Sequence, residues 1–146
     1  MRLNQPHYVD PRQDDAQLSL DGVWQFGYAD APAEHPGDVE LPCTATLPAA
    51  LFWNLSEAGV LPPPYQGLNS REYDWVDEKV WYFRKIFSVP ASAMGRTAIL
   101  CMDGAAYYTQ VWLNGTLLGE HEGMFGGPFV NVSGLLLWDA PNTLLV

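Results

Sequence analysis

The chain has 146 residues, of which 48% are hydrophobic and 16% charged, and its formal net charge at pH 7 is −10. This length and composition are typical of one globular domain rather than of a disordered segment. Seven Lys and Arg residues against seventeen Asp and Glu residues argue against a basic surface for nucleic acids or anionic membranes. No stretch approaches the roughly 18 apolar residues of a transmembrane helix. We therefore expect no nucleic-acid partner and no membrane partner.

The N-terminal segment and the cysteines bear on the cellular compartment. Residues 1–17 read as a polar lead-in without the apolar core of a signal peptide, followed by one domain over residues 18–146. Cys43 and Cys101 lie far apart in apolar surroundings, so we expect two reduced, buried thiols. Both features favour a cytoplasmic location. The N-x-S/T sequences are then interpreted as chance matches; they begin at Asn54, Asn114 and Asn131.

The domain opens with strand and loop signals. Asp21 and Gly22 predict a turn, and the residues up to Tyr28 alternate aromatic with polar or small side chains, as in a strand with one covered face. The prolines of residues 29–38 predict a loop. Residues 39–42 are expected to form a short strand at most.

Residues 48–58 are the one good helix candidate. A proline suits the first helical position, Leu51, Leu55 and Ala58 fall on one face, and Gly59 is placed to end the helix. Three consecutive prolines follow and predict an extended loop, because proline cannot donate to a strand ladder.

The second half of the chain reads as strands separated by Gly, Pro and Asn-Gly. Asn114 and Gly115 lie between two apolar runs, which is the strongest local signal for a hairpin. The glycine-rich residues 123–129 predict a shaped loop that presents two Phe and one Met. Together these signals predict an all-β fold, an antiparallel β-sandwich with one short helix. The expected strands are residues 80–89 (with both faces partly covered), 97–102, 105–113, 116–122 and 142–146.

The sequence stops inside an apolar run at Val146. We interpret the chain as a fragment whose last strand or strands are absent. An unpaired edge strand at Val146 would favour weak self-association, so a homo-oligomer is left open.

No catalytic, metal-binding or cofactor-binding residue is assigned from the sequence. The three histidines lack ligand spacing, two cysteines do not make a zinc site, and nucleophile-elbow and phosphate-binding motifs are absent. Glycosidases need a specific pair of carboxylates, and the sequence singles out no such pair.

One loop combines aromatic rings, which stack on the C–H faces of sugars, with planar polar groups, which hold sugar hydroxyls. A purely structural role for these residues is an equal alternative. The acidic residues beside Trp75 (Asp74, Asp77 and Glu78) are interpreted as an exposed loop, and Trp24, Trp81 and Trp112 as core. The candidate sugar-binding residues are Tyr65, Asn69, Arg71, Tyr73 and Trp75.

Several motifs occur in the order found in one family. PYQGLN at residues 64–69, then Trp75-Val76, then WYFRKIF at residues 81–87 resemble the N-terminal domain of glycoside hydrolase family 2, closest to its β-mannosidase-like branch. The resemblance extends over about residues 18–146. Its further pieces are LDGVW (20–24), AGVLP (58–62), Asp103-Gly104, VWLNG (111–115), Leu118-Gly119, Phe129 and NTL (142–144).

This resemblance implies a jelly-roll, galactose-binding-like β-sandwich that binds sugar but does not catalyse. In the family an immunoglobulin-like domain and a TIM barrel follow, and the barrel carries both catalytic glutamates of a retaining mechanism. Those domains would be the partners of this chain, which should be inactive alone. The loop from Tyr65 to Trp75 is expected to help wall the substrate pocket. Ser70 replaces the acidic residue usual in the β-mannosidase branch, so β-galactosides and β-glucuronides stay open as substrates.

Two other functions are compatible with the residues. A free-standing carbohydrate-binding module would use Tyr73 and Trp75. A sandwich that only mediates assembly would use the loop from Phe125 to Phe129.

Overall fold

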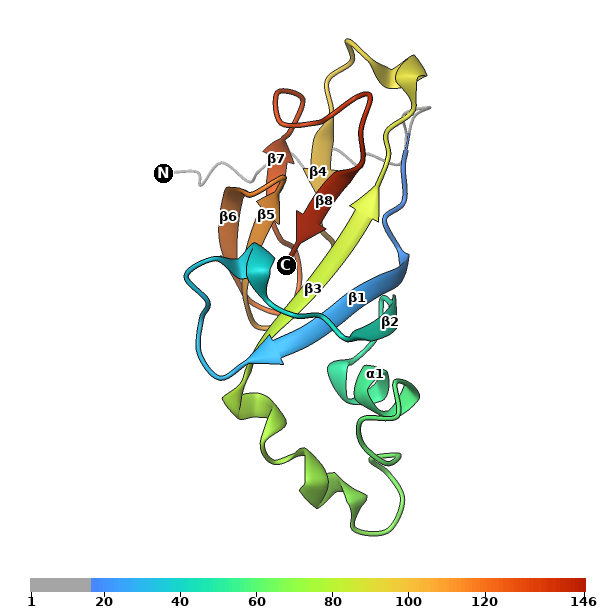
Figure 1. The fold of residues 1–146 in the computed structure, drawn as a ribbon, viewed down its shortest axis with the longest axis vertical. Coiled ribbons are helices and arrows are strands. Elements are labelled where there is room, and N and C mark those ends of the chain that lie inside the picture. Colours follow the sequence, from blue (N-terminus) through green and yellow to red (C-terminus); the bar gives the residue numbers. More distant parts are fainter. Residues whose placement is uncertain (1–16) are drawn as a thin grey trace, which may run out of the picture.

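A computed structural model describes residues 17–146 of the chain, so the predicted lead-in lies almost wholly outside the described residues. The helix α1 lies at one end of the molecule, below the strands (Figure 1). No helix among the described residues is long and apolar enough to cross a membrane. The elements are β1 (Gly22–Ala29), β2 (Cys43–Leu47), α1 (Leu51–Glu57), β3 (Val80–Phe87), β4 (Ile99–Cys101), β5 (Tyr108–Leu113), β6 (Thr116–Glu122), β7 (Phe129–Asn131) and β8 (Asn142–Leu145), with 3₁₀ turns at Pro36–Asp38, Asn69–Tyr73, Val76–Glu78 and Ala91–Ala93.

The strands form two antiparallel sheets. The larger sheet has the order β2-β1-β3-β8-β5-β6, and the smaller one pairs β4 with β7. Between them lies a core to which the small sheet contributes Leu100 and Val130. This architecture confirms the predicted all-β antiparallel sandwich with one short helix. The buried residues of this core are Trp24, Val111, Leu113, Val132 and Leu144.

The opposite face of the large sheet is covered by a loop rather than by a sheet. Neighbouring residues of a strand point to opposite faces, so Leu145 faces away from the core that Leu144 enters. Leu145 and Tyr82 pack there against Leu41 of the segment before β2. Residues 39–42 form no strand, which is within the expectation of a short strand at most; Leu41 packs on the sheet and the strand begins at Cys43.

The C-terminal strand lies inside the large sheet. β8 pairs with β3 on one side and with β5 on the other. Val146 continues the ladder, because its N–H donates to the carbonyl of Phe83 at 2.9 Å and its carbonyl accepts from Phe83 at 2.8 Å. The expected unpaired edge at Val146 is therefore wrong. The outer strands of this sheet are β2 and β6, so self-association through Val146 has no structural basis.

The central hairpin is confirmed. β5 and β6 are joined by Asn114 and Gly115, both with positive φ (51° and 81°), as a two-residue turn between twisted strands requires. The loop after β6 presents Phe125, which is 85% exposed, and Met124. Phe129 differs from expectation, since it opens β7 and pairs with Cys101 of β4.

The helix is shorter than predicted but ends as predicted. It begins at Leu51 rather than at Pro48, and its C-terminus closes where Gly59 adopts φ 71°. The N–H groups of Gly59 and Val60 donate to the carbonyls of Ser56 and Leu55 at 3.0 and 2.9 Å. These two bonds make a Schellman motif, which requires a residue such as glycine in the left-handed region.

The cysteines are both free, but they are less buried than expected. Cys43 is half-buried and Cys101 is exposed. Along the short strand β4, Leu100 points into the core, so its neighbour Cys101 points outward. The expectation of two buried thiols is therefore wrong for Cys101.

The helix carries one polar side chain with no partner. Asn54 is fully buried, and neither its Oδ1 nor its Nδ2 makes a hydrogen bond with any described residue. Such a group costs about 1–3 kcal/mol of desolvation. We expect Asn54→Leu to leave the free energy of unfolding unchanged or to raise it by about 1 kcal/mol, because leucine also favours helix.

Urea unfolding measures this effect, with Asn54→Asp as the opposite control. Burying a carboxylate at the same place should lower the stability. A fall of more than about 1 kcal/mol for Asn54→Leu would show that the amide is paired in solution or that the site is too tight for leucine.

Candidate functional site

The five candidate sugar-binding residues all lie in one segment, between α1 and β3. This segment runs below the sheets, at the end of the molecule away from β4 and β7 (Figure 1). It contains no strand and is built from two 3₁₀ turns after a proline run. The structure therefore brings the five residues to one region but gives them different environments.

Tyr73 is a core residue that holds the segment in place. Its side chain is 2% exposed, and its ring lies 4.8 Å from that of Phe52 on α1, between centroids. Its hydroxyl donates to the carbonyl of Pro62 at 2.7 Å. Burial raises the pKa of this phenol. With its ring covered on this domain, Tyr73 offers no face for a sugar to stack on.

Asn69 also ties the segment together, whereas Tyr65 and Arg71 project from it. The side-chain amide of Asn69 donates to the carbonyl of Pro63 at 2.9 Å, which closes the loop around Tyr65. Tyr65 is 89% exposed and Arg71 is exposed. A ring and a guanidinium are thus presented on a loop whose backbone is held from within.

Trp75 packs on two aromatic rings of the sheet. Its ring centroid lies 5.1 Å from Tyr28 of β1 and 5.9 Å from Trp81 of β3, and those two rings are 5.0 Å apart. We call Tyr28, Trp75 and Trp81 the aromatic cluster. Trp24 is buried, as expected, while Trp81 and Trp112 are only half-buried.

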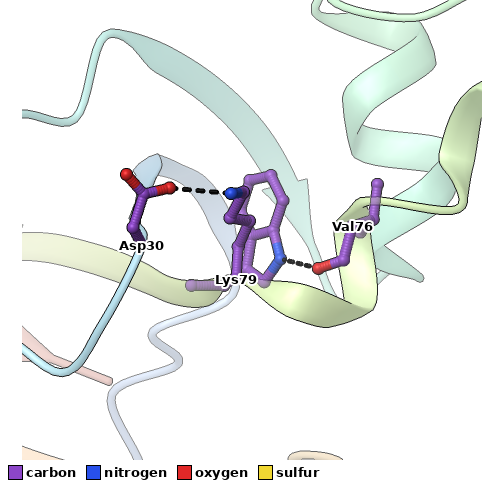
Figure 2. A network of polar contacts seen from close by, with 4 residues as sticks. Asp30, Val76 and Lys79 are labelled. Atoms are coloured by element: carbon purple, nitrogen blue, oxygen red, sulfur yellow. Dashed lines mark hydrogen bonds and ion pairs between the residues drawn. The ribbon is translucent and has the colours of Figure 1, made fainter.

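Two polar contacts fix the junction where the segment meets the sheet. The indole N–H of Trp81 donates to the carbonyl of Val76 at 2.9 Å. Lys79 reaches Asp30, after the end of β1, at 2.7 Å (Figure 2). This hydrogen bond raises the pKa of Lys79. The start of β3 and the end of β1 are therefore held together beside the aromatic cluster.

A half-open cavity of about 420 Å³ lies beside the aromatic cluster. Its lining includes Tyr28 and Trp81 of the aromatic cluster, Leu55 and Val60 on the helix side, and Glu40 of the segment before β2. The sequence did not single out Tyr28 or Glu40, since the first read as part of a covered strand face and the second as part of a strand. Their juxtaposition depends on the loop before β2, and no local pattern signals it.

The acidic groups beside Trp75 face solvent. Asp74, Asp77 and Glu78 are exposed, as predicted. Residues 17–146 contain no group of three or more His, Cys, Asp or Glu side chains able to hold a metal ion.

The comparison with protein families decides where this chain belongs. Residues 24–146 match the family described as glycosyl hydrolase 2 galactose-binding domain-like. This chain belongs to that family. The relatives that match this chain are larger proteins, and the chain covers only a small part of each.

The β-mannosidase B of Thermothelomyces thermophilus is 31% identical over 119 residues, which are 82% of this chain and 13% of that protein. For the β-mannosidase B of Aspergillus terreus the identity is 30%, over 88% of this chain and 15% of that protein.

Solved structures of larger enzymes contain a domain with the same fold as this chain. The β-D-mannosidase of Dictyoglomus thermophilum superposes with a TM-score of 0.74 at 29% identity, covering 88% of this chain and 15% of that one. A Lactobacillus rhamnosus β-glucuronidase shares the fold, with a TM-score of 0.63 at 23% identity over 86% of this chain and 20% of that one. This glycosyl hydrolase 2 chain therefore corresponds to the N-terminal domain of larger enzymes and spans about a seventh of the relatives' length.

Proposed function

We propose that this domain is the non-catalytic N-terminal part of a β-glycosidase and that it helps to wall the substrate pocket. The observation that carries the proposal is the pair of exposed groups, Tyr65 and Arg71, on a loop held by Tyr73 and Asn69. A loop so held can place a ring and a guanidinium at a fixed position next to a second domain. Positioning groups of this kind act best when their own support is rigid.

The enzyme is proposed to act on β-mannosides, with carbohydrate breakdown as its role. The names of the relatives support this choice, because β-mannosidases are among both the sequence relatives and the solved structures. The catalytic groups are proposed to lie on further domains of the same enzyme. A cytoplasmic location is part of the proposal and is supported by the two free thiols.

The test uses the full-length enzyme that contains this domain, assayed with an aryl β-mannoside. We expect Tyr65→Ala and Arg71→Ala each to lower kcat/KM by about 5- to 100-fold, which corresponds to about 1–3 kcal/mol, chiefly through KM. The 146-residue chain alone should show no turnover.

Matched controls exist on other parts of the surface. Tyr107→Ala removes another exposed tyrosine, and Arg96→Ala removes another exposed arginine. Both should keep kcat/KM within about twofold, since isolated surface changes have small effects. Equal kcat/KM for all four variants and the unaltered enzyme would overturn the pocket-wall role.

A further inference from the structure

The turn between β5 and β6 contains a chemically reactive dipeptide. Asparagine is a labile residue, and it is most labile before glycine, because no side chain then hinders the approach of the next backbone nitrogen to the asparagine amide. Gly115 is exposed, and no atom lies within 4 Å of the position that a Cβ atom would take. Each of the other four asparagines in residues 17–146 precedes a residue with a side chain. Asn114 is therefore the asparagine of this part of the chain with the highest intrinsic tendency to lose its amide.

The reaction needs only water and passes through a cyclic imide. The backbone nitrogen of Gly115 loses its proton to solvent and attacks the side-chain carbonyl carbon, Cγ, of Asn114. The bond from Cγ to Nδ2 breaks, and the side-chain nitrogen leaves as ammonia. Water then opens the imide at either of its carbonyl carbons. The product has a carboxylate in place of the amide, on an aspartyl or an isoaspartyl backbone.

The fold holds the side chain that this reaction has to move. Nδ2 of Asn114 donates to the carbonyl of Leu135 at 2.8 Å and to Oδ1 of Asn142 at 2.9 Å. Oδ1 of Asn114 accepts from the backbone N–H of Thr143 at 2.8 Å, and the backbone N–H of Asn114 donates to the carbonyl of Thr143 at 2.9 Å. The amide is thus fixed by β8 and by the loop before it. Cγ cannot turn toward the nitrogen of Gly115 unless several of these bonds break.

We propose that Asn114 is a concealed deamidation site, which these hydrogen bonds protect in the folded domain and which becomes reactive when the turn detaches from β8. Local openings of this kind have free energies between zero and that of global unfolding. Each opening gives the dipeptide its intrinsic reactivity for as long as the opening lasts. The rate of modification therefore depends on how often the turn detaches. This property does not depend on the pocket-wall role proposed above, since neither Tyr65 nor Arg71 takes part in it.

The product of the reaction cannot rebuild these bonds. An ionised carboxylate accepts hydrogen bonds but donates none, so the carbonyl of Leu135 and Oδ1 of Asn142 lose the donor of Asn114 and face a negative charge instead. Asn142 is fully buried, where a polar atom that loses its partner is costly. An isoaspartyl linkage also lengthens the backbone of a turn whose geometry fits two residues. A domain that opens and is modified therefore returns to a less stable fold, which makes the modification a one-way step.

The experiment compares deamidation of Asn114 in the folded and the unfolded protein. The full-length enzyme that contains this domain is incubated at mildly alkaline pH with and without guanidinium chloride, and peptide mass spectrometry follows the conversion of each amide to a carboxylate. We expect Asn114 to be modified at least about 30-fold more slowly in the folded enzyme than in the unfolded one. A capped synthetic peptide of residues 113–117 is the control for effects of the denaturant on the chemistry. Its rate should be the same in both solutions.

Two pairs of variants locate the protection. Asn142→Ala removes the buried partner of the amide and should speed modification of Asn114 in the folded enzyme at least about tenfold. Asn131→Ala changes an exposed asparagine elsewhere and should keep the rate within about twofold. Asn114→Asp installs the product and should speed proteolysis of the folded domain at least about fivefold, because cleavage follows the population of the open form. Asn131→Asp adds the same charge where the side chain only accepts a bond, from Ser133, and should not change that rate.

Three results would overturn the proposal. They are equal rates of modification at Asn114 in the folded and the unfolded enzyme, a rate in the folded enzyme that Asn142→Ala leaves unchanged, and equal proteolysis of Asn114→Asp and Asn131→Asp. The first comparison needs no variant, so it decides the question even if a substituted enzyme does not fold. None of these results bears on the kinetic test with Tyr65 and Arg71, so the two proposals can fail separately.

Discussion

Replacing Asn142 by alanine is expected to lower the free energy of unfolding by about 2–5 kcal/mol, measured by urea unfolding. Asn142 is fully buried at the start of β8. Its Oδ1 accepts from the side chain of Asn114 at 2.9 Å and from the backbone of Leu137 at 2.8 Å, and its Nδ2 donates to Leu137 at 2.9 Å. The substitution leaves several buried polar groups without partners.

The reason for so large an effect is that this amide joins three parts of the fold. Asn114 belongs to the central hairpin, and its own Oδ1 accepts from the backbone of Thr143 at 2.8 Å. The hairpin turn, the loop before β8 and β8 itself are therefore linked through two asparagines. Networks of this kind are favourable only when every member is paired.

Asn131→Ala is the matched control for Asn142→Ala. Asn131 is exposed, and its side chain makes one local bond, accepting from Ser133 at 3.0 Å. The loss of stability should stay below about 1 kcal/mol. If both alanine variants lost the same stability, the network around Asn142 would not have the structural role assigned to it.

The second large effect is expected at Tyr73. Tyr73→Ala should lower the free energy of unfolding by about 3–5 kcal/mol, because it empties a buried aromatic position beneath α1. Tyr73→Phe keeps the ring and removes the hydroxyl, which donates to the carbonyl of Pro62 at 2.7 Å and lies 3.4 Å from that of Phe52, so about 1–2 kcal/mol should be lost. Near-ultraviolet circular dichroism during urea unfolding reports both.

Tyr65→Ala is the control within the same segment. Tyr65 is 89% exposed, so its removal should change stability by less than about 0.5 kcal/mol. If Tyr73→Ala lowered the free energy of unfolding only slightly, the segment would keep its structure without this side chain. Tyr73 would then again be a candidate for contact with a ligand. A large loss supports the division of the segment into supporting and presenting residues.

Local sequence signals correctly predicted the turns and helix ends that need a residue with positive φ. Asn114-Gly115 predicted the hairpin because few other dipeptides accept positive φ at both positions. Gly59 predicted the end of α1 for the same kind of reason. The beginning of α1 was placed too early and the strand at Cys43–Leu47 was missed, since side-chain patterns around Pro42 and Pro48 fit several boundaries.

The candidate site was predictable only as a segment. The residue types at Tyr65, Asn69, Arg71, Tyr73 and Trp75 suit sugar binding, and the sequence alone offers no way to tell supporting residues from presenting ones. Burial made that division, because Tyr73 is covered by α1 and Trp75 by two rings from the sheet.

By itself, the sequence determined the all-β class, the central hairpin and the resemblance to glycoside hydrolase family 2, since turn chemistry and strand periodicity act over a few residues. Only the tertiary structure decided that β8 enters the middle of the large sheet and that Cys101 faces outward. It alone brought Glu40 to Tyr28. These features join residues far apart along the chain, and what sets them is the packing of whole elements, which no local pattern records.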